Sequence, residues 1–166
     1  MIYAAPDFEK KIVNPEELLN AVAKIKTNGP LVFTNGCFDL LHRGHVTYLA
    51  QAKSLGSTLI VALNSDDSVK RQNKGSERPL QSLENRLAVI ASLAAVDYVT
   101  YFNEDTPLHL IEQIMPNILV KGGDWPISAI VGSALVIEHG GTVHSIPFLF
   151  STSTTKLVEQ IRHYGN

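Results

Sequence analysis

Two histidines, His42 and His45, stand three residues apart with Gly44 between them. A helix is predicted to begin here, and this spacing places both imidazoles on one side of its first turn. The N–H groups of that turn, the positive end of the helix and two imidazole donors then converge on one point, where an anion such as a polyphosphate would bind. Gly44 allows another group to approach the backbone closely. Asn35 and Gly36 would form the floor of this anion site.

Three other interpretations of the histidine pair stay open. The motif can arise by chance, both residues can be ordinary surface or core histidines, or they can be zinc ligands. Zinc fits least well, because the only cysteine, Cys37, lies in the same loop and no second ligand pair has a suitable spacing. Phosphate binding fits position and motif together. Cys37 is expected to be a small packed residue rather than a nucleophile.

Two further segments combine flexible backbone with polar groups. Ser153-Thr154-Thr155 opens the last predicted helix and offers hydroxyls and unpaired N–H groups, which is typical of a second anion site; simple capping by Ser153 is the alternative. Lys121-Gly122-Gly123-Asp124 follows a predicted strand, so its glycines would let the backbone approach a base or ribose while Lys121 meets a phosphate. The alternative there is a glycine turn with solvated charges.

Single residues in the other loops suggest weaker contacts. Asp66 would touch the ribose or the metal side of the phosphates, or cap a helix. Arg78 and Arg86 are candidate clamps for an acceptor phosphate, or part of a solvated face. Trp125 would stack on a ligand or cover the adjacent helix. Lys53 is expected to be a surface lysine.

Strands and helices alternate along the chain. Asn14, Pro15 and Glu17 predict the start of a first helix, and Gly29 suits its end. In the helix after the histidines, Val46, Leu49 and Ala50 are expected to face inward. The predicted strands are 31–35, 58–63, 97–102, 118–120 and 142–146, and the later helices are 44–55, 82–94, 106–115 and 153–163.

Five such alternations predict an α/β fold with a doubly wound, five-stranded parallel sheet and helices on both faces. Ligands of these sheets bind beyond the carboxyl ends of the strands, where the winding reverses. The loops 35–45, 64–78 and 121–126 are therefore the expected site.

Composition narrows the class of protein. The 166 residues suit one domain, with 1–29 as a helical preamble and 30–166 as the catalytic core. Fourteen Lys and Arg against sixteen Asp and Glu give a formal charge of −2, which argues against a nucleic-acid partner. One cysteine allows no intramolecular disulfide, and neither a signal peptide nor a membrane-spanning run is evident. We expect a cytoplasmic protein that binds no membrane.

The residues 35–45 resemble the G-x-F-D-x-x-H-x-G-H signature of the cytidylyltransferase-like nucleotidyltransferase superfamily. Segments in the same order along the chain make the resemblance more specific to the adenylyltransferases of ADP-heptose synthesis: 61–71, Arg78-Pro79-Leu80, Glu84-Asn85-Arg86, 95–99, 104–107, 119–125 and 153–156. The similarity covers about residues 30–162. It implies transfer of AMP from ATP to heptose 1-phosphate, with release of pyrophosphate, by a homodimer.

The resemblance and the positions of the residues together give the expected site. A sugar 1-phosphate is already largely dianionic at neutral pH, so it needs no general base, and Mg²⁺ carried by the ATP phosphates would supply further charge. The expected catalytic residues are His42, His45 and Lys121, and no residue is expected to bind metal directly. Expected nucleotide contacts are Thr34, Asn35, Gly36, Phe38, Gly44, Asn64, Asp66, Gly122, Gly123, Asp124, Ser151, Thr152, Ser153, Thr154 and Thr155. Expected acceptor contacts are Asp39, Arg78, Arg86 and Trp125.

In many of the proteins that the chain resembles, the transferase domain is fused behind a sugar kinase domain. This chain is too short to include such a kinase. We therefore expect its sugar phosphate to be made elsewhere. Two rival functions remain: a cytidylyltransferase acting on glycerol 3-phosphate or another polyol phosphate, and a nucleotide-binding module without turnover.

Overall fold

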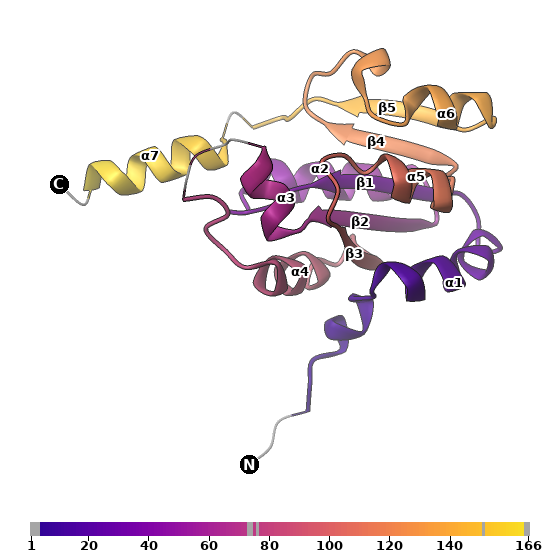
Figure 1. The fold of residues 1–166 in the computed structure, drawn as a ribbon, viewed down its shortest axis with the longest axis horizontal. Helices are drawn as coiled ribbons and strands as arrows, with labels where there is room; N and C mark the ends of the chain where they lie inside the picture. Colours follow the sequence, from indigo (N-terminus) through magenta and orange to yellow (C-terminus); the bar gives the residue numbers. More distant parts are fainter. Residues whose placement is uncertain (1–3, 73–74, 76, 151, 165–166) are drawn as a thin grey trace.

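A five-stranded parallel sheet forms the centre of the molecule (Figure 1). The computed structural model describes residues 4–72, 75, 77–150 and 152–164. The strand order is β3-β2-β1-β4-β5, so the predicted doubly wound α/β fold is confirmed. The strands are β1 (Leu31–Gly36), β2 (Thr58–Asn64), β3 (Tyr98–Phe102), β4 (Ile118–Gly122) and β5 (Thr142–Ile146).

Helices cover both faces of the sheet, and each face has its own apolar core. Buried side chains of α2 and α4 pack on one face, and those of α1, α5 and α6 pack on the other. The described helices are η1 (Asp7–Lys11), α1 (Pro15–Lys26), α2 (Arg43–Lys53), α3 (Asp66–Arg71), α4 (Leu83–Ala91), α5 (Leu108–Ile114), η2 (Ile127–Ala129), α6 (Ser133–Glu138) and α7 (Thr154–Tyr164).

The winding reverses between the two central strands. From β1 the chain moves outward to β2 and β3, then returns to place β4 on the other side of β1. Thr34 of β1 pairs with Val61 of β2 on one side and with Val120 of β4 on the other. The carboxyl ends of β1 and β4 therefore meet at the switch point, where parallel sheets bind their ligands.

Helix starts follow the predicted capping residues. The Asn14 side chain accepts a hydrogen bond from the Glu17 backbone, and the Glu17 carboxylate accepts one from the Asn14 backbone, which completes a capping box. Ser82 caps α4 through its side chain alone, which accepts a hydrogen bond from a backbone N–H of the first turn. Such caps satisfy backbone donors that a helix leaves unpaired, so they act locally and can be predicted from short segments.

Three local predictions were wrong or incomplete. Helices α3 and α6 were not predicted, because six residues are too few for a clear apolar period. In α2, Leu49 is buried as predicted, but Val46 and Ala50 are exposed. The face on the sheet instead follows residues 44, 48, 49 and 52, whose glycine, tyrosine and alanine give a weak hydrophobic signal.

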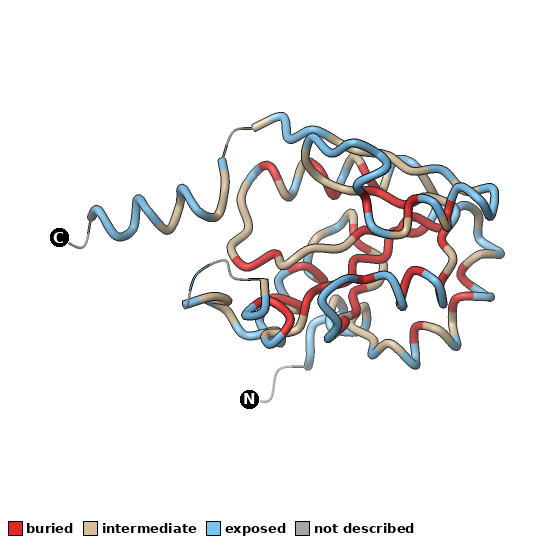
Figure 2. The backbone as a smooth tube through the Cα atoms, turned by 45° about the horizontal axis from the view of Figure 1, so that its top comes forward, coloured by how far each residue is buried: buried red, intermediate tan, exposed pale blue. Residues whose placement is uncertain are grey.

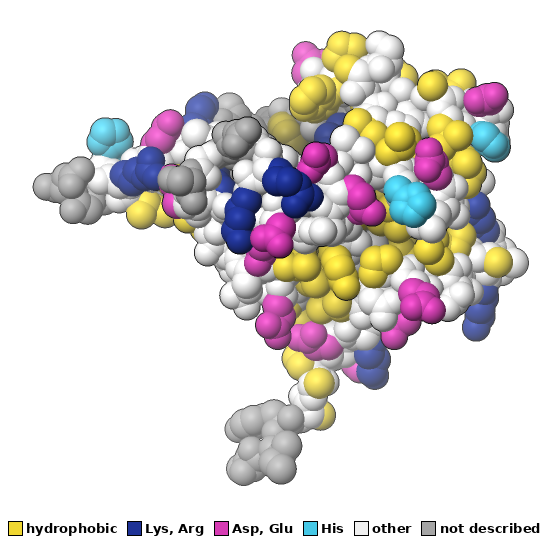
Figure 3. All heavy atoms as spheres, in the orientation of Figure 1, with side chains coloured by type: hydrophobic (Ala, Val, Ile, Leu, Met, Phe, Trp, Pro, Cys, Tyr) yellow, Lys and Arg dark blue, Asp and Glu magenta, His cyan; other side chains and the backbone are white. Residues whose placement is uncertain are grey.

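The last helix, α7, projects away from the body of the molecule, and its outer turns are largely exposed (Figures 1 and 2). On the face seen in Figure 3, Lys and Arg side chains are interspersed with Asp and Glu side chains and do not form one continuous basic patch. Among the described residues, none of the helices is long and apolar enough to cross a membrane.

Candidate active site

The two predicted histidines lie together at the start of α2. His42 directly precedes the helix and His45 belongs to its first turn, and their rings stack with centroids 3.9 Å apart and planes 27° from parallel. The Nδ1 atoms of both rings are buried and have no hydrogen-bond partner among the residues that the structure describes. Such paired, unsatisfied ring nitrogens at a helix N-terminus favour an anionic ligand.

Burial keeps both imidazoles neutral at pH 7. Burial first, and then the neighbouring His42, lower the pKa of His45 to about 4. Burial also lowers the pKa of His42. Each neutral ring carries one N–H donor, and bound phosphate would oppose the effect of burial by favouring the charged form.

Aromatic rings frame the histidines. The Phe38 ring meets His45 edge-on at 5.4 Å, and Phe148 lies 6.0 Å from His45 and 6.4 Å from His42. Phe148 was missed by the sequence analysis, because it lies in the loop after β5 and comes close only through the fold. A Cβ added to Gly44 would lie 3.0 Å from the His42 ring, so Gly44 gives room to His42 as well as to a ligand.

A pocket of about 260 Å³ opens beside His45. Residues of the histidine loop and of the start of α7 line this pocket together, as predicted. The two segments are also joined by a hydrogen bond, which the Thr154 hydroxyl donates to the Leu40 carbonyl at 3.1 Å. Ser153 also caps α7 by accepting from the Lys156 backbone at 3.2 Å. Thr152 is exposed, and Ser151 lies outside the described residues. The pocket is lined by Cys37, Phe38, Asp39, His45, Val69, Arg78, Thr154 and Thr155.

A second pocket of about 180 Å³ lies against the first, and Cys37 lines both. The Lys121 ammonium lies there, 3.4 Å from both the carbonyl and the side-chain oxygen of Asn35. The Cys37 thiol contacts the Gln72 side-chain oxygen at 3.3 Å, as a packed residue would. This pocket is lined by Asn35, Gly36, Cys37, Asn64, Gln72, Asp105, Thr106, Pro107, Lys121 and Val131. Of these, Gln72, Asp105, Thr106, Pro107 and Val131 were not predicted as site residues.

Asp39 is buried and holds the loop that carries Arg78. Its carboxylate accepts from the backbone N–H groups of Leu80 at 2.9 Å and Gln81 at 3.0 Å, and it forms an ion pair with Arg78. Burial opposes ionisation of Asp39, but the two backbone donors and Arg78 outweigh it and lower its pKa. Asp39 and Arg78 both line the first pocket, but the Asp39 carboxylate is already engaged by protein groups, and the clamp role expected for Arg78 stays a prediction.

Arg86 is enclosed by protein and is not part of a solvated face. Its nitrogens donate to the carbonyls of Gln81 at 3.1 Å and Cys37 at 2.7 Å, and to the Asp66 carboxylate at 2.7 Å. Its side chain is 0% exposed, so its placement does not support a direct clamp on acceptor phosphate. Asp66 does not cap α3, because Ser65 does.

Two other predicted nucleotide contacts face the interior. The Thr34 hydroxyl is buried against the phenol of Tyr48, which also donates to the Val120 carbonyl at 3.4 Å. Burial raises the pKa of Tyr48, so it remains a neutral phenol. Asn64 is 2% exposed and donates to Ser68 at 3.0 Å, although it borders the second pocket. The prediction that Thr34 contacts the nucleotide is therefore not supported, since its hydroxyl is already engaged.

Trp125 covers the glycine turn after β4. Its indole N–H donates to the Gly122 carbonyl at 3.2 Å, and its backbone N–H donates to Ser145 at 2.9 Å. Gly123 has a positive φ of +117°, and a Cβ there would lie 2.7 Å from the indole nitrogen. The indole thus covers the glycine turn rather than the adjacent helix, and its stacking on a ligand stays a prediction. Asp124 is exposed, and the described linings of the two pockets include neither residue.

The fold and the site define the class first: an α/β domain of the nucleotidyltransferase type, with two histidines and a helix N-terminus gathered at its switch point. The chain belongs to the cytidylyltransferase-like family, whose sequence profile matches residues 33–158.

Similar proteins narrow the class further. A D-beta-D-heptose 1-phosphate adenylyltransferase of Bordetella bronchiseptica is 53% identical over 155 residues, which cover 93% of this chain and 96% of that protein. The bifunctional protein HldE of Haemophilus influenzae is 51% identical over 162 residues; the match covers 97% of this chain but only 34% of that protein. The present chain therefore spans about a third of the bifunctional relative.

Solved structures agree with the fold. A lipopolysaccharide core biosynthesis protein of Thermoplasma volcanium superposes with a TM-score of 0.58 at 28% identity, over 75% of this chain and 99% of that one. A pantothenate synthetase of Thermus thermophilus superposes with the same TM-score over 82% of this chain and 61% of that one. Its 15% identity supports the fold alone.

Proposed function

We propose that the protein transfers AMP from ATP to D-glycero-β-D-manno-heptose 1-phosphate, giving ADP-heptose and pyrophosphate. The observation that carries this proposal is the 53% identity to a heptose 1-phosphate adenylyltransferase across nearly the whole of both chains. The geometry supports the same reaction class, because two adjoining pockets at the switch point suit a reaction of two substrates.

The residues act by positioning and by electrostatics. The sugar phosphate is its own nucleophile, and its oxygen attacks the α-phosphorus while the bond to pyrophosphate breaks. His42, His45 and the N-terminus of α2 would donate to the phosphate chain and stabilise the charge that develops on pyrophosphate. The threonines at the start of α7 and the ammonium of Lys121 approach the same region from the two pockets.

Mg²⁺ would enter with ATP and neutralise part of the phosphate charge. The described residues include no group of three or more His, Cys, Asp and Glu side chains suited to hold a metal ion. The carboxylates that line the two pockets, Asp39 and Asp105, are paired with arginines. We therefore propose that the nucleotide phosphates provide most of the ligands of the ion.

A coupled assay for pyrophosphate release tests the proposal with ATP or CTP against heptose 1-phosphate or glycerol 3-phosphate. The expected result is release only with a heptose 1-phosphate and preferentially with ATP, with ADP-heptose identified by mass spectrometry. Release with CTP and glycerol 3-phosphate would instead support the cytidylyltransferase alternative. The homodimer implied by the resemblance stays a prediction, for which light scattering is the measurement.

A further inference from the structure

Phe38 has a backbone conformation that L-residues rarely adopt. Its φ is +47°, in the left-handed region, which costs a non-glycine residue about 1 kcal/mol or more. Such a conformation persists only where its surroundings enforce it, and it is found most often at functional sites. Phe38 is 7% exposed, its ring lies edge-on to His45, and a Cβ at Gly36 would lie 2.9 Å from it.

The chain is held on both sides of Phe38. Before it, the Cys37 carbonyl accepts a hydrogen bond from Arg86 at 2.7 Å. After it, the Asp39 carboxylate accepts from the Gln81 backbone at 3.0 Å. The Gln81 carbonyl in turn accepts from Arg86 at 3.1 Å. Arg86 and Asp39 therefore join the segments 37–39 and 80–81 into one unit around Phe38.

We propose that Arg86 is a positioning residue for the transfer reaction, which holds Phe38 in its left-handed conformation and so places the Phe38 ring against His45. The inference rests on the proposed role of the histidines in phosphate binding. Arg86 is fully buried and contributes to the described lining of neither pocket, so it acts through the loop rather than on substrate. Its pairing with Asp66 offsets part of the cost of burying its charge.

Arg86→Lys is the informative substitution, because it keeps the positive charge beside Asp66. A single ammonium cannot reproduce the guanidinium fork that reaches Cys37 and Gln81 together. We expect kcat for pyrophosphate release to fall about 10- to 100-fold, with KM for heptose 1-phosphate changed less than about threefold. In a His45→Ala background the same substitution should cost less than about threefold more, because its effect passes through His45.

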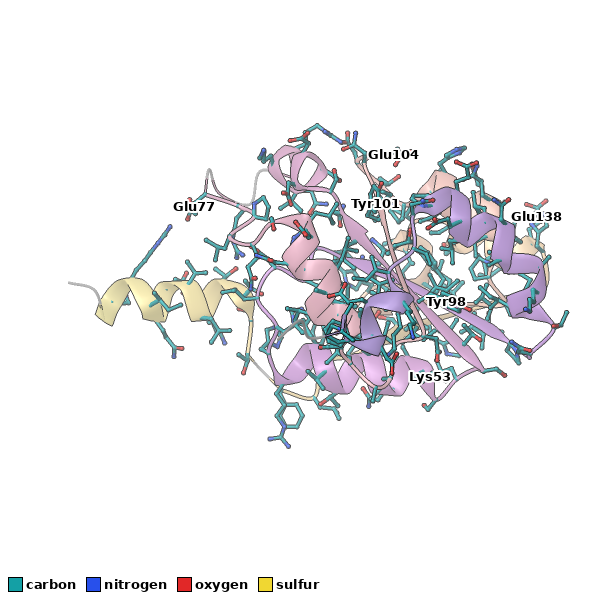
Figure 4. The ribbon with its side chains drawn as sticks, turned by 90° about the horizontal axis from the view of Figure 1, so that it is seen from below. Lys53, Glu77, Tyr98, Tyr101, Glu104 and Glu138 are labelled. Carbon is teal, nitrogen blue, oxygen red and sulfur yellow. The ribbon has the colours of Figure 1, made fainter. Side chains whose placement is uncertain are left out.

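Lys53→Gln is the matched control. Lys53 also forms a partly buried ion pair, with Asp97 at 2.6 Å, and it also binds a carbonyl, that of Ser57. It lies at the end of α2 away from α7 and Glu77 (Figure 4). The control should lower the unfolding temperature and leave kcat of the folded protein unchanged. A loss in Arg86→Lys as small as in this control would overturn the proposal.

Two kinetic outcomes would also overturn it. If Arg86→Lys costs the same factor with and without His45, the two residues act independently. If the substitution raises KM for heptose 1-phosphate and leaves kcat unchanged, Arg86 contributes to acceptor binding instead of loop position.

A readout without catalysis separates this inference from the proposed function. In the free protein, NMR of labelled histidines should show His45 still neutral at pH 5, and Arg86→Lys should move its titration midpoint toward 6.5 as the Phe38 ring withdraws. If Arg86→Lys does not fold, Phe38→Leu removes the aromatic edge and should shift His45 in the same direction. An unmoved His45 overturns the inference. A wild-type protein that releases no pyrophosphate overturns the proposed function alone.

Discussion

The rings of His42 and His45 stack at 3.9 Å, and within the described part of the chain the Nδ1 atom of each is buried without a hydrogen-bond partner. Two imidazoles so close together cannot both become charged cheaply, because each positive charge opposes the other. They remain neutral until an anion arrives. The pair is therefore preorganised to donate to phosphate. Keeping both rings neutral makes the folded protein less stable at low pH, where the unfolded chain binds protons that the folded protein does not.

The histidine pair should be required for turnover. His42→Ala or His45→Ala is expected to lower kcat by roughly 10²–10³, the scale for losing one preorganised donor in a transition state. Circular dichroism should show an intact fold, since α2 still packs through Tyr48 and Leu49. Nearly wild-type turnover in both variants would exclude the pair from the mechanism.

Stability should decrease as the pH falls from 7 to 5. The lowered pKa of His45, about 4, means that the unfolded chain binds a proton below about 6.5 that the native protein does not. The free energy of unfolding should then fall by at most about 1.4 kcal/mol per pH unit from this group. Urea unfolding at each pH measures it, and the slope should be smaller in His45→Asn. The ionised Asp39, whose pKa is lowered, stabilises the fold. This contribution is lost only at a lower pH, where the carboxylate becomes protonated.

Cys37→Ser should stay active within about threefold, because the acceptor phosphate is the nucleophile and the thiol packs against the side-chain oxygens of Gln72 and Asn64. The measurement is pyrophosphate release together with the intact mass of the protein after incubation with ATP. An AMP adduct on Cys37 would contradict the mechanism.

ATP should be preferred over CTP at least tenfold in kcat/KM, a difference of about 1.4 kcal/mol. One or two hydrogen bonds that fit the adenine edge and leave a group unpaired with cytosine are enough. The Gly122-Gly123 turn does not supply them in this structure, because Trp125 and Ser145 donate to its carbonyls and the Gly123 N–H donates to Ile146. The expected preference rests instead on the similarity to a heptose 1-phosphate adenylyltransferase. The measurement is kcat/KM for ATP and for CTP, each with heptose 1-phosphate as the acceptor. Equal values, or a preference for CTP, would remove the main support for the heptose substrate.

The sequence by itself determined the features that depend on neighbours along the chain. The capping residues Asn14, Ser82 and Ser153, the continuous apolar strands, and the histidine pair at a helix start act within a few residues. Alternation of strand and helix then restricts the topology to a doubly wound sheet, because parallel strands need right-handed crossovers. The two pockets are lined by residues of the loops after β1 and β2 and by Lys121 at the end of β4, where the same reasoning expects the site.

Only the tertiary structure decided which polar side chains serve the site and which serve the fold. Arg78 and Arg86 have the same chemistry and lie eight residues apart, yet one borders a pocket and the other is fully enclosed. Thr34 is turned inward by Tyr48, and Phe148 comes to the histidines from a distant loop. These outcomes depend on partners remote in sequence, because a buried polar group takes whichever hydrogen-bond partner the fold brings to it.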